Sequence, residues 1–325
     1  MTPNFRQQAK QNKRHIVLPE GDSPRILEAA VYCDQEGIAK ITVLGDRDEI
    51  TQNLDALKLS LGDIEIISID DYEASGAFAE TLYQRCLSRK LTKANAEDLC
   101  KDPLIFADLM VQEGHVDACV AGIKHTSGDV IRAALKAIGP KKPKSRPSSI
   151  FILESEVFPT PVVFADCAMN IAPNVQQLTD IAYQSSRSIK SLLGLDAKIA
   201  MLSFSTNGSA YHRDVNKVRQ ATELLKEQHP ELNVIGEIQF DAAISKDILK
   251  KKWPESDFDA PANVFIFPNL DAANTAYKIA EQMGKAKAIG PILQGLAKPV
   301  NDLSRGANVS SIIDTIAVTC LQVED

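Results

Sequence analysis

Short apolar runs recur along this chain, and longer amphipathic stretches separate them. The runs are HIVL (15–18), KITVL (40–44) and VDACVAGI (116–123), followed by others of the same kind at 64–70, 148–155, 198–205, 233–239 and 263–269. Uninterrupted apolar strands that alternate with helices are typical of a mainly parallel sheet covered on both faces. The pattern therefore predicts the α/β fold class. After the first run, Ser23 and Pro24 are suited to the start of a helix.

The length and composition predict two domains. A chain of 325 residues with 44% apolar content can bury a sizeable core and exceeds the usual size of one domain. The stretch IGPKKPKSRPSS (138–149) is rich in Pro, Lys and Ser and is typical of a crossing between domains. A return crossing is expected near KAIGPILQGLAKP (287–299). We therefore expect a discontinuous first domain, residues 1–143 plus 292–325, and a second domain of residues 144–291.

Charge and cysteine content exclude several classes of protein. A net charge of -7 argues against nucleic acid as a partner, although a local arginine pocket can still bind small anions. The six cysteines have no C-x-x-C spacing, which predicts no zinc site, no disulfide framework and free thiols in a reducing cytoplasm. Residues 1–21 lack the apolar core of a secretory signal, and no apolar run has the length of a membrane span.

The stretch VAGIKHTSGDVIRAAL (120–135) has the layout of a strand, a polar loop and a helix. Such a loop lies at the carboxyl end of a parallel strand, where α/β proteins bind ligands. Thr126, Ser127 and Gly128 supply hydroxyl groups and close backbone approach, and the helix amides favour an anion. Arg132 can reach the same anion with two hydrogen bonds. The alternative is an ordinary capped helix with an arginine that faces solvent.

Two further polar features are open to two interpretations each. His125 is either a hydrogen-bonding scaffold residue or a base. The loop LSFSTNGSA (202–210) either lines a polar cleft or uses its hydroxyl and amide groups to satisfy its own backbone.

The stretch KPVNDLSRGANVSS (298–311) precedes a predicted helix. Apolar residues recur at helical spacing from Val309 to Leu321, and Asn308 is suited to the N-cap position. Ser304, Arg305 and Gly306 therefore lie in the loop before a helix. A triplet of this kind is common in proteins, so only its context can give it meaning.

That context is a family resemblance that covers nearly the whole chain. The sequence resembles the catalytic region of phosphate acetyltransferases, without a regulatory N-terminal extension. The resemblance is carried by LPEGDSPRILEAA, DACVAGIKHTSGDVIRAAL, FADCAMNIAPNVQQLTDIA, AMLSFSTNGSA, GEIQFDAAI, NVFIFPNLDAANTAYKIAEQM and GPILQGLAKPVNDLSRGA. It implies two α/β domains that face a cleft, as in isocitrate and isopropylmalate dehydrogenases, and a homodimer.

The resemblance also implies the reaction and its residues. Acetyl would pass reversibly between coenzyme A and phosphate by direct thiolate attack in a ternary complex, in the acetate metabolism of the cytoplasm. The expected partners are CoA, acetyl-CoA, acetyl phosphate and inorganic phosphate, with no cofactor and no metal. Ser304 and Arg305 would lie beside the thiol and the reacting carbonyl, and Arg132 would hold the CoA or phosphoryl group. Lys298 is expected to assist substrate binding.

The chain departs from the family pattern at two places. The family usually has an aspartate seven residues after the motif serine, where it is thought to act as base, and this chain has Ser311. Asp314 lies about one helical turn further on and is our candidate replacement. The family also often has an arginine where this chain has Cys86, so Arg85 or Arg89 is expected to make that anion contact. A catalytically weakened acetyl-CoA sensor and an enzyme for a longer acyl group are the alternatives.

Overall fold

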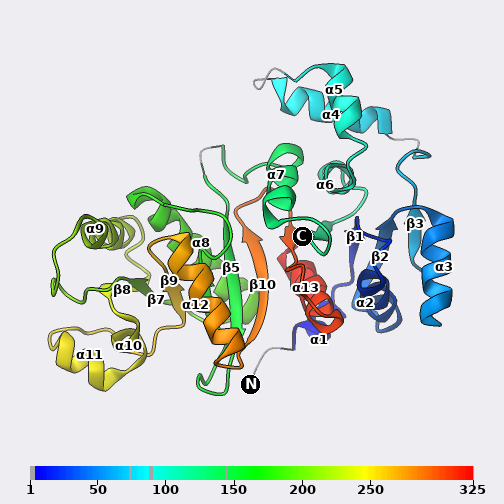
Figure 1. Ribbon diagram of the computed structural model, residues 1–325. Helices are drawn as coiled ribbons and strands as arrows, with labels where there is room; N and C mark the ends of the chain where they lie inside the picture. Colours follow the sequence, from blue (N-terminus) through cyan, green and yellow to red (C-terminus); the bar gives the residue numbers. More distant parts are fainter. Residues whose placement is uncertain (1–3, 73–74, 88–90, 144, 325) are drawn as a thin grey trace. The chain divides into compact units, whose positions relative to one another are not determined.

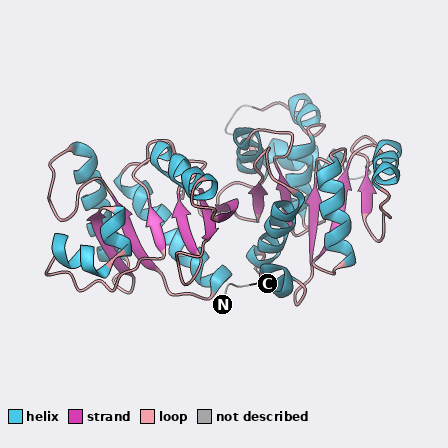
Figure 2. Ribbon diagram, turned by 60° about the horizontal axis from the view of Figure 1, so that its bottom comes forward, coloured by secondary structure: helices cyan, strands magenta, loops and turns pink. Residues whose placement is uncertain are grey.

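The structure is a computed structural model that describes residues 4–72, 75–87, 91–143 and 145–324 (Figure 1). The chain divides into two compact units. One, the central unit, is Ser145–Gly295, and the other, the discontinuous unit, joins residues 4–143 to 296–324. Figure 2 shows strands flanked by helices in each unit, which confirms the α/β class.

The discontinuous unit contains a five-stranded sheet in the order β11-β4-β1-β2-β3. All neighbouring strands in this sheet are parallel. The strands are β1 (Arg14–Leu18), β2 (Ala39–Leu44), β3 (Glu65–Ile67), β4 (Ala118–Ala121) and β11 (Val300–Asp302). Their apolar side chains are almost fully buried, as a sheet covered on both faces requires.

The helices of the discontinuous unit are α1 (Phe5–Ala9), α2 (Pro24–Gln35), α3 (Arg47–Leu57), α4 (Ser75–Arg85), α5 (Lys93–Leu99), α6 (Pro103–Glu113), α7 (Ser127–Ala137) and α13 (Val309–Gln322). Helices α2 and α13 pack together on one face of the sheet, and α6 and α7 pack together on the other. Figure 1 shows α13 in red beside the short α1, and α4 and α5 beyond α6.

Two predicted helix starts are confirmed. Ser23 occupies the N-cap position of α2, with Pro24 as the first helical residue, where its missing N–H costs nothing. Asn308 is the N-cap of α13, and its side-chain oxygen accepts a hydrogen bond from the Ser311 amide at 2.9 Å. These caps fix the point at which each loop at the sheet edge becomes a helix.

The central unit contains a six-stranded sheet in the order β10-β5-β6-β9-β7-β8. The strands are β5 (Ser148–Glu154), β6 (Val162–Ala165), β7 (Lys198–Leu202), β8 (Asn233–Ile238), β9 (Val264–Ile266) and β10 (Lys287–Gln294). Strands β6, β9, β7 and β8 are parallel, whereas β5 pairs antiparallel with both β6 and β10. The helices are α8 (Val175–Leu193), α9 (Arg213–Gln228), α10 (Phe240–Ile244), α11 (Lys246–Lys252) and α12 (Leu270–Gln282).

Three strands had no counterpart in the sequence analysis: β6, β10 and β11. Strand β10 is interrupted by Gly290 and Pro291, and its register against β5 shifts there. The stretch read as a return crossing is therefore a strand as far as Gln294, and the central unit ends at Gly295. Strand β11 is three residues long, and its Asn301 and Asp302 are polar, so it gives no apolar run.

An acidic side chain is buried in the core of the discontinuous unit. Asp108, on α6, is 2% exposed, and its Oδ1 has no hydrogen-bond partner. Burial raises the pKa of this carboxyl well above its ordinary range, and the Cys119 thiol of β4 is the neighbour that moderates the shift. The folded protein therefore keeps the proton on Asp108 at a pH where the unfolded chain has lost it.

We predict that this proton makes stability fall as pH rises. Between the ordinary pKa of an aspartate and the raised pKa of Asp108, the folded state binds more protons than the unfolded state. The free energy of unfolding should then fall by about 1.4 kcal/mol per pH unit across that window. Urea denaturation of Asp108→Asn over a pH series should lack this slope. Asp98→Asn, at an exposed position, is the control and should keep it.

Candidate functional site at the carboxyl edge of the parallel sheet

The parallel register brings the two most distinctive sequence stretches together. Strand β4 lies between β1 and β11, with Ala121 opposite Asp302 and Ala118 opposite Ile16. The loops that follow these three strands therefore lie at one edge of the sheet. They are the Glu20–Ser23 loop, the Gly122–Thr126 loop and the Leu303–Asn308 loop.

Glu20 organises the loop after β4. It is 2% exposed, and its carboxylate accepts the backbone N–H groups of Gly122 and Ile123 at 2.9 Å and of Lys124 at 2.8 Å. The His125 N–H also donates to it at 3.2 Å, and the His125 ring Nδ1 lies 2.7 Å away. His125 thus has the contacts of a scaffold residue, the first of its two interpretations.

The start of α7 combines a cap with an arginine. Thr126 is the N-cap, and its hydroxyl and the Asp129 carboxylate satisfy each other and the backbone in a capping box. Arg132 pairs with Asp129, and a Cβ at Gly128 would lie 3.0 Å from Arg132 Nη1. Gly128 therefore leaves room for a guanidinium over the first helical turn, beside Ser127, and this arrangement can bind an anion.

Ser304 and Arg305 lie in an exposed turn before α13. The Ala307 N–H donates to the Ser304 carbonyl at 2.8 Å and closes this turn. Arg25, from the start of α2, donates to the carbonyl groups of Arg305 at 3.0 Å and Ala307 at 2.6 Å. The Arg305 guanidinium forms no ion pair with any residue in the described part of the chain. It can therefore donate hydrogen bonds to an oxygen atom of a ligand.

The two candidates for a base lie in different surroundings. Ser311 is half-buried on the first turn of α13, and its hydroxyl donates to Asn308 Oδ1 at 3.1 Å. Asp314 is 3% exposed, and its carboxylate accepts from Arg6 Nε of α1 at 2.6 Å. Its role as base stays a prediction.

Two other predicted binding residues lie away from this edge. Arg85 donates to the Ile138 carbonyl at the carboxyl end of α7, about 15 Å along the helix from Ser127. Lys298 precedes β11 and donates to the Val111 carbonyl at the end of α6, 2.7 Å away. Both cations therefore bind terminal helix carbonyl groups, where a positive charge is favoured. Arg89 lies outside the described residues.

Sequence analysis gave no role to Glu20 or Asp302. Asp302 ends β11 with a fully buried side chain, in the motif that supplies Ser304 and Arg305. Burial raises its pKa to about 7, while the Ser127 hydroxyl, the Leu303 amide and the Glu20 charge also act on it. For Glu20, the available signal was an acidic residue just after an apolar strand, whereas Asp302 lies in a stretch with no apolar run and had no such signal.

The polar loop of the central unit uses its side chains locally. Ser205 donates to Glu237 at 3.0 Å, Thr206 donates to Gln239 at 3.2 Å, and Ser209 lies against the Thr206 amide at 3.1 Å. Arg219 also pairs with Glu237 at 2.9 Å. Within the loop, Ser203, Ser205 and Ser209 also accept hydrogen bonds from backbone N–H groups, as the second interpretation expects.

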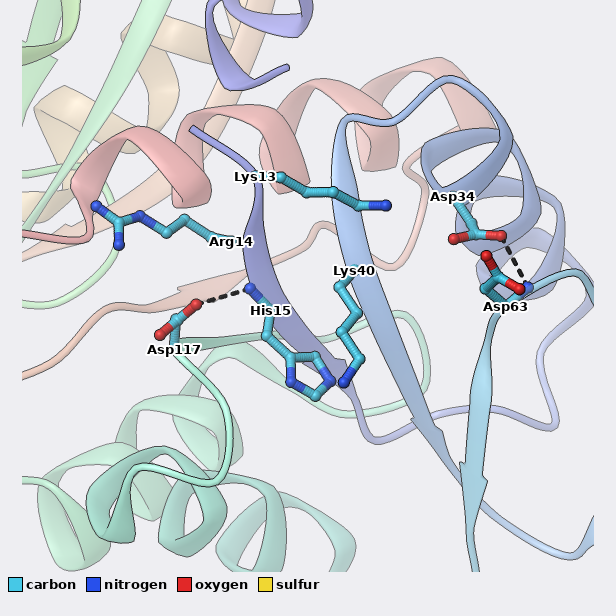
Figure 3. A pocket seen from close by; sticks show the side chains of 7 residues that line it. All are labelled: Lys13, Arg14, His15, Asp34, Lys40, Asp63 and Asp117. Carbon is cyan, nitrogen blue, oxygen red and sulfur yellow. Dashed lines mark hydrogen bonds between the residues drawn. The ribbon is translucent and has the colours of Figure 1, made fainter. Parts of the chain in front are cut away.

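A pocket of about 390 Å³ lies at the opposite, amino edge of the same parallel sheet (Figure 3). It is lined by Lys13, Arg14, His15, Asp34, Lys40, Asp63 and Asp117. Burial lowers the pKa of His15, and the charge of Lys40 lowers it further. Four of the lining side chains are Lys, Arg or His and three are Asp, and none of the predicted site residues lines this pocket.

In residues 4–72, 75–87, 91–143 and 145–324, no three His, Cys, Asp or Glu side chains are grouped so as to hold a metal ion. No helix in this part of the chain is long and apolar enough to cross a bilayer.

The fold and the edge loops define an α/β protein of two units, and comparisons with known proteins identify its class. A 4-hydroxythreonine-4-phosphate dehydrogenase from Klebsiella pneumoniae superposes with a TM-score of 0.56 at 11% identity, covering 96% of this chain and 98% of that one, which shows a shared fold alone. A phosphotransacetylase from Streptococcus pyogenes superposes with a TM-score of 0.92 at 38% identity, covering 98% of this chain and 96% of that one.

Sequence comparison gives the family. The model of the phosphate acetyl/butaryl transferase family matches residues 1–320, and the chain belongs to this family of acyltransferases. A phosphate acetyltransferase from Thermoanaerobacterium thermosaccharolyticum is 42% identical over 98% of both chains. Other relatives are longer: this chain spans 62% of the phosphate acetyltransferase of Helicobacter pylori, to which it is 39% identical over 99% of its own length.

We predict that Glu20 stabilises the fold through its hydrogen bonds to the loop. Glu20→Gln replaces an acceptor oxygen with an amide that faces backbone donors. It should lower the free energy of unfolding by about 2–4 kcal/mol, measured by urea denaturation. Asp22→Asn is the matched control, because Asp22 pairs with Lys124 on the surface, and it should cost less than about 1 kcal/mol. Equal effects of the two variants would refute the role of Glu20.

Proposed function

We propose that this protein is a phosphate acetyltransferase that transfers acetyl reversibly between coenzyme A and phosphate. The observation that carries the proposal is the position of the Ser304–Arg305 turn beside the Ser127–Arg132 helix start, at one edge of a parallel sheet. The names of the relatives support it. A thioester donor and a phosphate acceptor need a carbonyl-polarising group next to an anion site, and the two loops supply these groups.

The proposed step is a direct exchange. In the direction of acetyl-CoA synthesis, the CoA sulfur attacks the carbonyl of acetyl phosphate, a C–S bond forms and the C–O bond to phosphate breaks. The thiol proton ends on the released phosphate. Arg305 would stabilise the developing oxyanion, and Ser304 would hydrogen-bond the sulfur. Arg132 and the α7 amide groups would hold a phosphate, and binding both substrates together would supply the remaining rate enhancement through orientation.

The proposal includes the substrates and the assembly. CoA, acetyl-CoA, acetyl phosphate and inorganic phosphate are the expected ligands, with no cofactor and no metal, in a cytoplasmic homodimer. A longer acyl group is the nearest alternative, because the family description includes a butaryl transferase. Butyryl phosphate assayed in parallel with acetyl phosphate distinguishes the two.

We predict that Arg305 carries the oxyanion contact. Formation of the thioester bond from acetyl phosphate and CoA, followed by ultraviolet absorbance, should be readily measurable for the wild type. Arg305→Ala should lower turnover by about 100-fold or more, which corresponds to about 3 kcal/mol for one preorganised donor. Arg305→Lys should recover only part of this loss, because an ammonium cannot reproduce the planar fork. A folded Arg305→Ala protein with near-normal turnover would remove this residue from the mechanism.

We predict that Ser311 leaves the thiol without a dedicated base. Turnover should then climb with pH toward the pKa of a free thiol, about 8.5. Ser311→Asp should raise kcat near neutral pH and flatten the climb, and a carboxylate in the first turn of α13 is favoured by about 0.3–1 kcal/mol. Asp314→Asn should be measured in parallel. Loss of activity in a folded Asp314→Asn protein, with no effect of Ser311→Asp, would assign the base to Asp314.

A further inference from the structure

The turn that carries Ser304 and Arg305 can adopt a second backbone conformation. The Ala307 N–H donates to the Ser304 carbonyl at 2.8 Å, so residues 304–307 form a hydrogen-bonded β-turn with Arg305 and Gly306 as its central residues. Neither central residue has a positive φ, which excludes type II and both primed types. The turn is therefore of type I, although glycine in the third position is the residue that type II requires.

The two turn types differ by a rotation of the Arg305–Gly306 peptide. In a trans peptide the C=O and N–H bonds point in opposite directions. The Arg305 carbonyl points to Arg25, so the Gly306 N–H points to the other side, where it donates to Ser304 Oγ at 3.3 Å. In type II this peptide is turned over. The Arg305 carbonyl would then replace the N–H beside Ser304 Oγ.

Arg25 makes the contacts that select the observed conformation. Its Nη1 donates to the Arg305 carbonyl at 3.0 Å and to the Ala307 carbonyl at 2.6 Å. A turned-over peptide would present an N–H to this cation and lose the first of these hydrogen bonds. Arg25 lies in the first turn of α2, where the helix dipole disfavours a cation. The two carbonyl groups, and not the stability of its own helix, therefore explain an arginine at this position.

We propose that Arg25 is a positioning residue that holds the Arg305–Gly306 peptide in the orientation that the reaction needs. While Ser304 Oγ accepts from the Gly306 N–H, the Ser304 O–H is free to donate to the CoA sulfur. A turned-over peptide would place a carbonyl oxygen there, which would accept the Ser304 O–H and withdraw it from the sulfur. The inference rests on the proposed function for the role of Ser304, whereas the selection of the turn depends only on the hydrogen bonds described above.

Steady-state kinetics of acetyl transfer test the effect on the reaction. Arg25→Met keeps an unbranched side chain and removes the donors. It should lower kcat about tenfold, as when about one molecule in ten keeps the reactive turn. The KM for CoA and for acetyl phosphate should change by less than about twofold, because no substrate contact is lost. Arg25→Lys should recover most of kcat, since one nitrogen makes both hydrogen bonds.

Arg47→Met is the matched control. Arg47 also lies in the first turn of a helix, α3, and donates to a backbone carbonyl, that of Ile66 at 3.2 Å. This variant should keep the wild-type kcat. If Arg25→Met does not fold, as judged by its thermal midpoint, Arg25→Gln replaces it, because the shorter side chain cannot span both carbonyl groups.

A second substitution tests the turn itself. Among the described residues outside its chain neighbours, a Cβ at Gly306 would meet only Ser304 Oγ, at 3.8 Å, so alanine fits the observed turn. Alanine resists the positive φ that type II requires. In the Gly306→Ala background, Arg25→Met should therefore lower kcat by less than about threefold, and a double-mutant cycle measures this coupling. Equal losses in the two backgrounds would overturn the inference.

Crystal structures of Arg25→Met and Arg47→Met show the peptide orientation without turnover. The first should have a positive φ at Gly306, and the second should retain the type I turn. Three results count against the inference: a type I turn in Arg25→Met, an unchanged kcat in the folded variant, or a raised KM with unchanged kcat, which would make Arg25 a substrate contact. A wild type that transfers no acetyl group, with a turned-over peptide in Arg25→Met, would refute the proposed function and leave the selection of the turn by Arg25 standing.

Discussion

The candidate site depends on one buried carboxylate. Glu20 draws four consecutive backbone N–H groups of the loop after β4 onto its two oxygens and holds the His125 ring. Because its amide groups are already hydrogen-bonded to Glu20, this loop turns away from the sheet and places Thr126 at the N-cap position of the next helix. Several hydrogen bonds to one buried carboxylate hold this loop in place, so the start of α7 is fixed although Thr126 and Arg132 are exposed.

The predicted binding residues fall into two groups in the unit that contains the parallel sheet: some lie on the loops at its carboxyl edge, and others bind helix ends. Its carboxyl edge gathers the Ser127 and Ser304 loops, and Arg25 ties the second of these to α2. Lys298 and Arg85 instead bind carbonyl groups at the ends of α6 and α7. A basic residue whose position in the sequence is close to the edge loops can therefore bind either a ligand or the carbonyl groups of a helix end. Only the path of the backbone at that residue decides which of the two its side chain reaches.

The sequence carried enough to predict the α/β class, eight of the strands by location, and the caps at Ser23 and Asn308. These features follow from local periodicity and local hydrogen bonds. Strands β6, β10 and β11 were not predicted, because short or interrupted strands are stabilised by neighbouring strands that are distant in the sequence. The roles of Glu20 and Asp302 were not predicted for the same reason. Each residue interacts with a loop about a hundred or more residues away in the sequence, and no local pattern encodes such a contact.

Three acidic groups of the discontinuous unit show how surroundings rather than residue type assign roles. Glu20 accepts hydrogen bonds from backbone donors, Asp314 accepts one from Arg6, and burial raises the pKa of Asp302 to about 7. A carboxylate that accepts several hydrogen bonds fixes the structure around it, whereas a buried carboxyl with a pKa of about 7 exchanges a proton near neutral pH. Of these three groups, Asp302 lies nearest in sequence to the proposed reaction loop, two residues before Ser304.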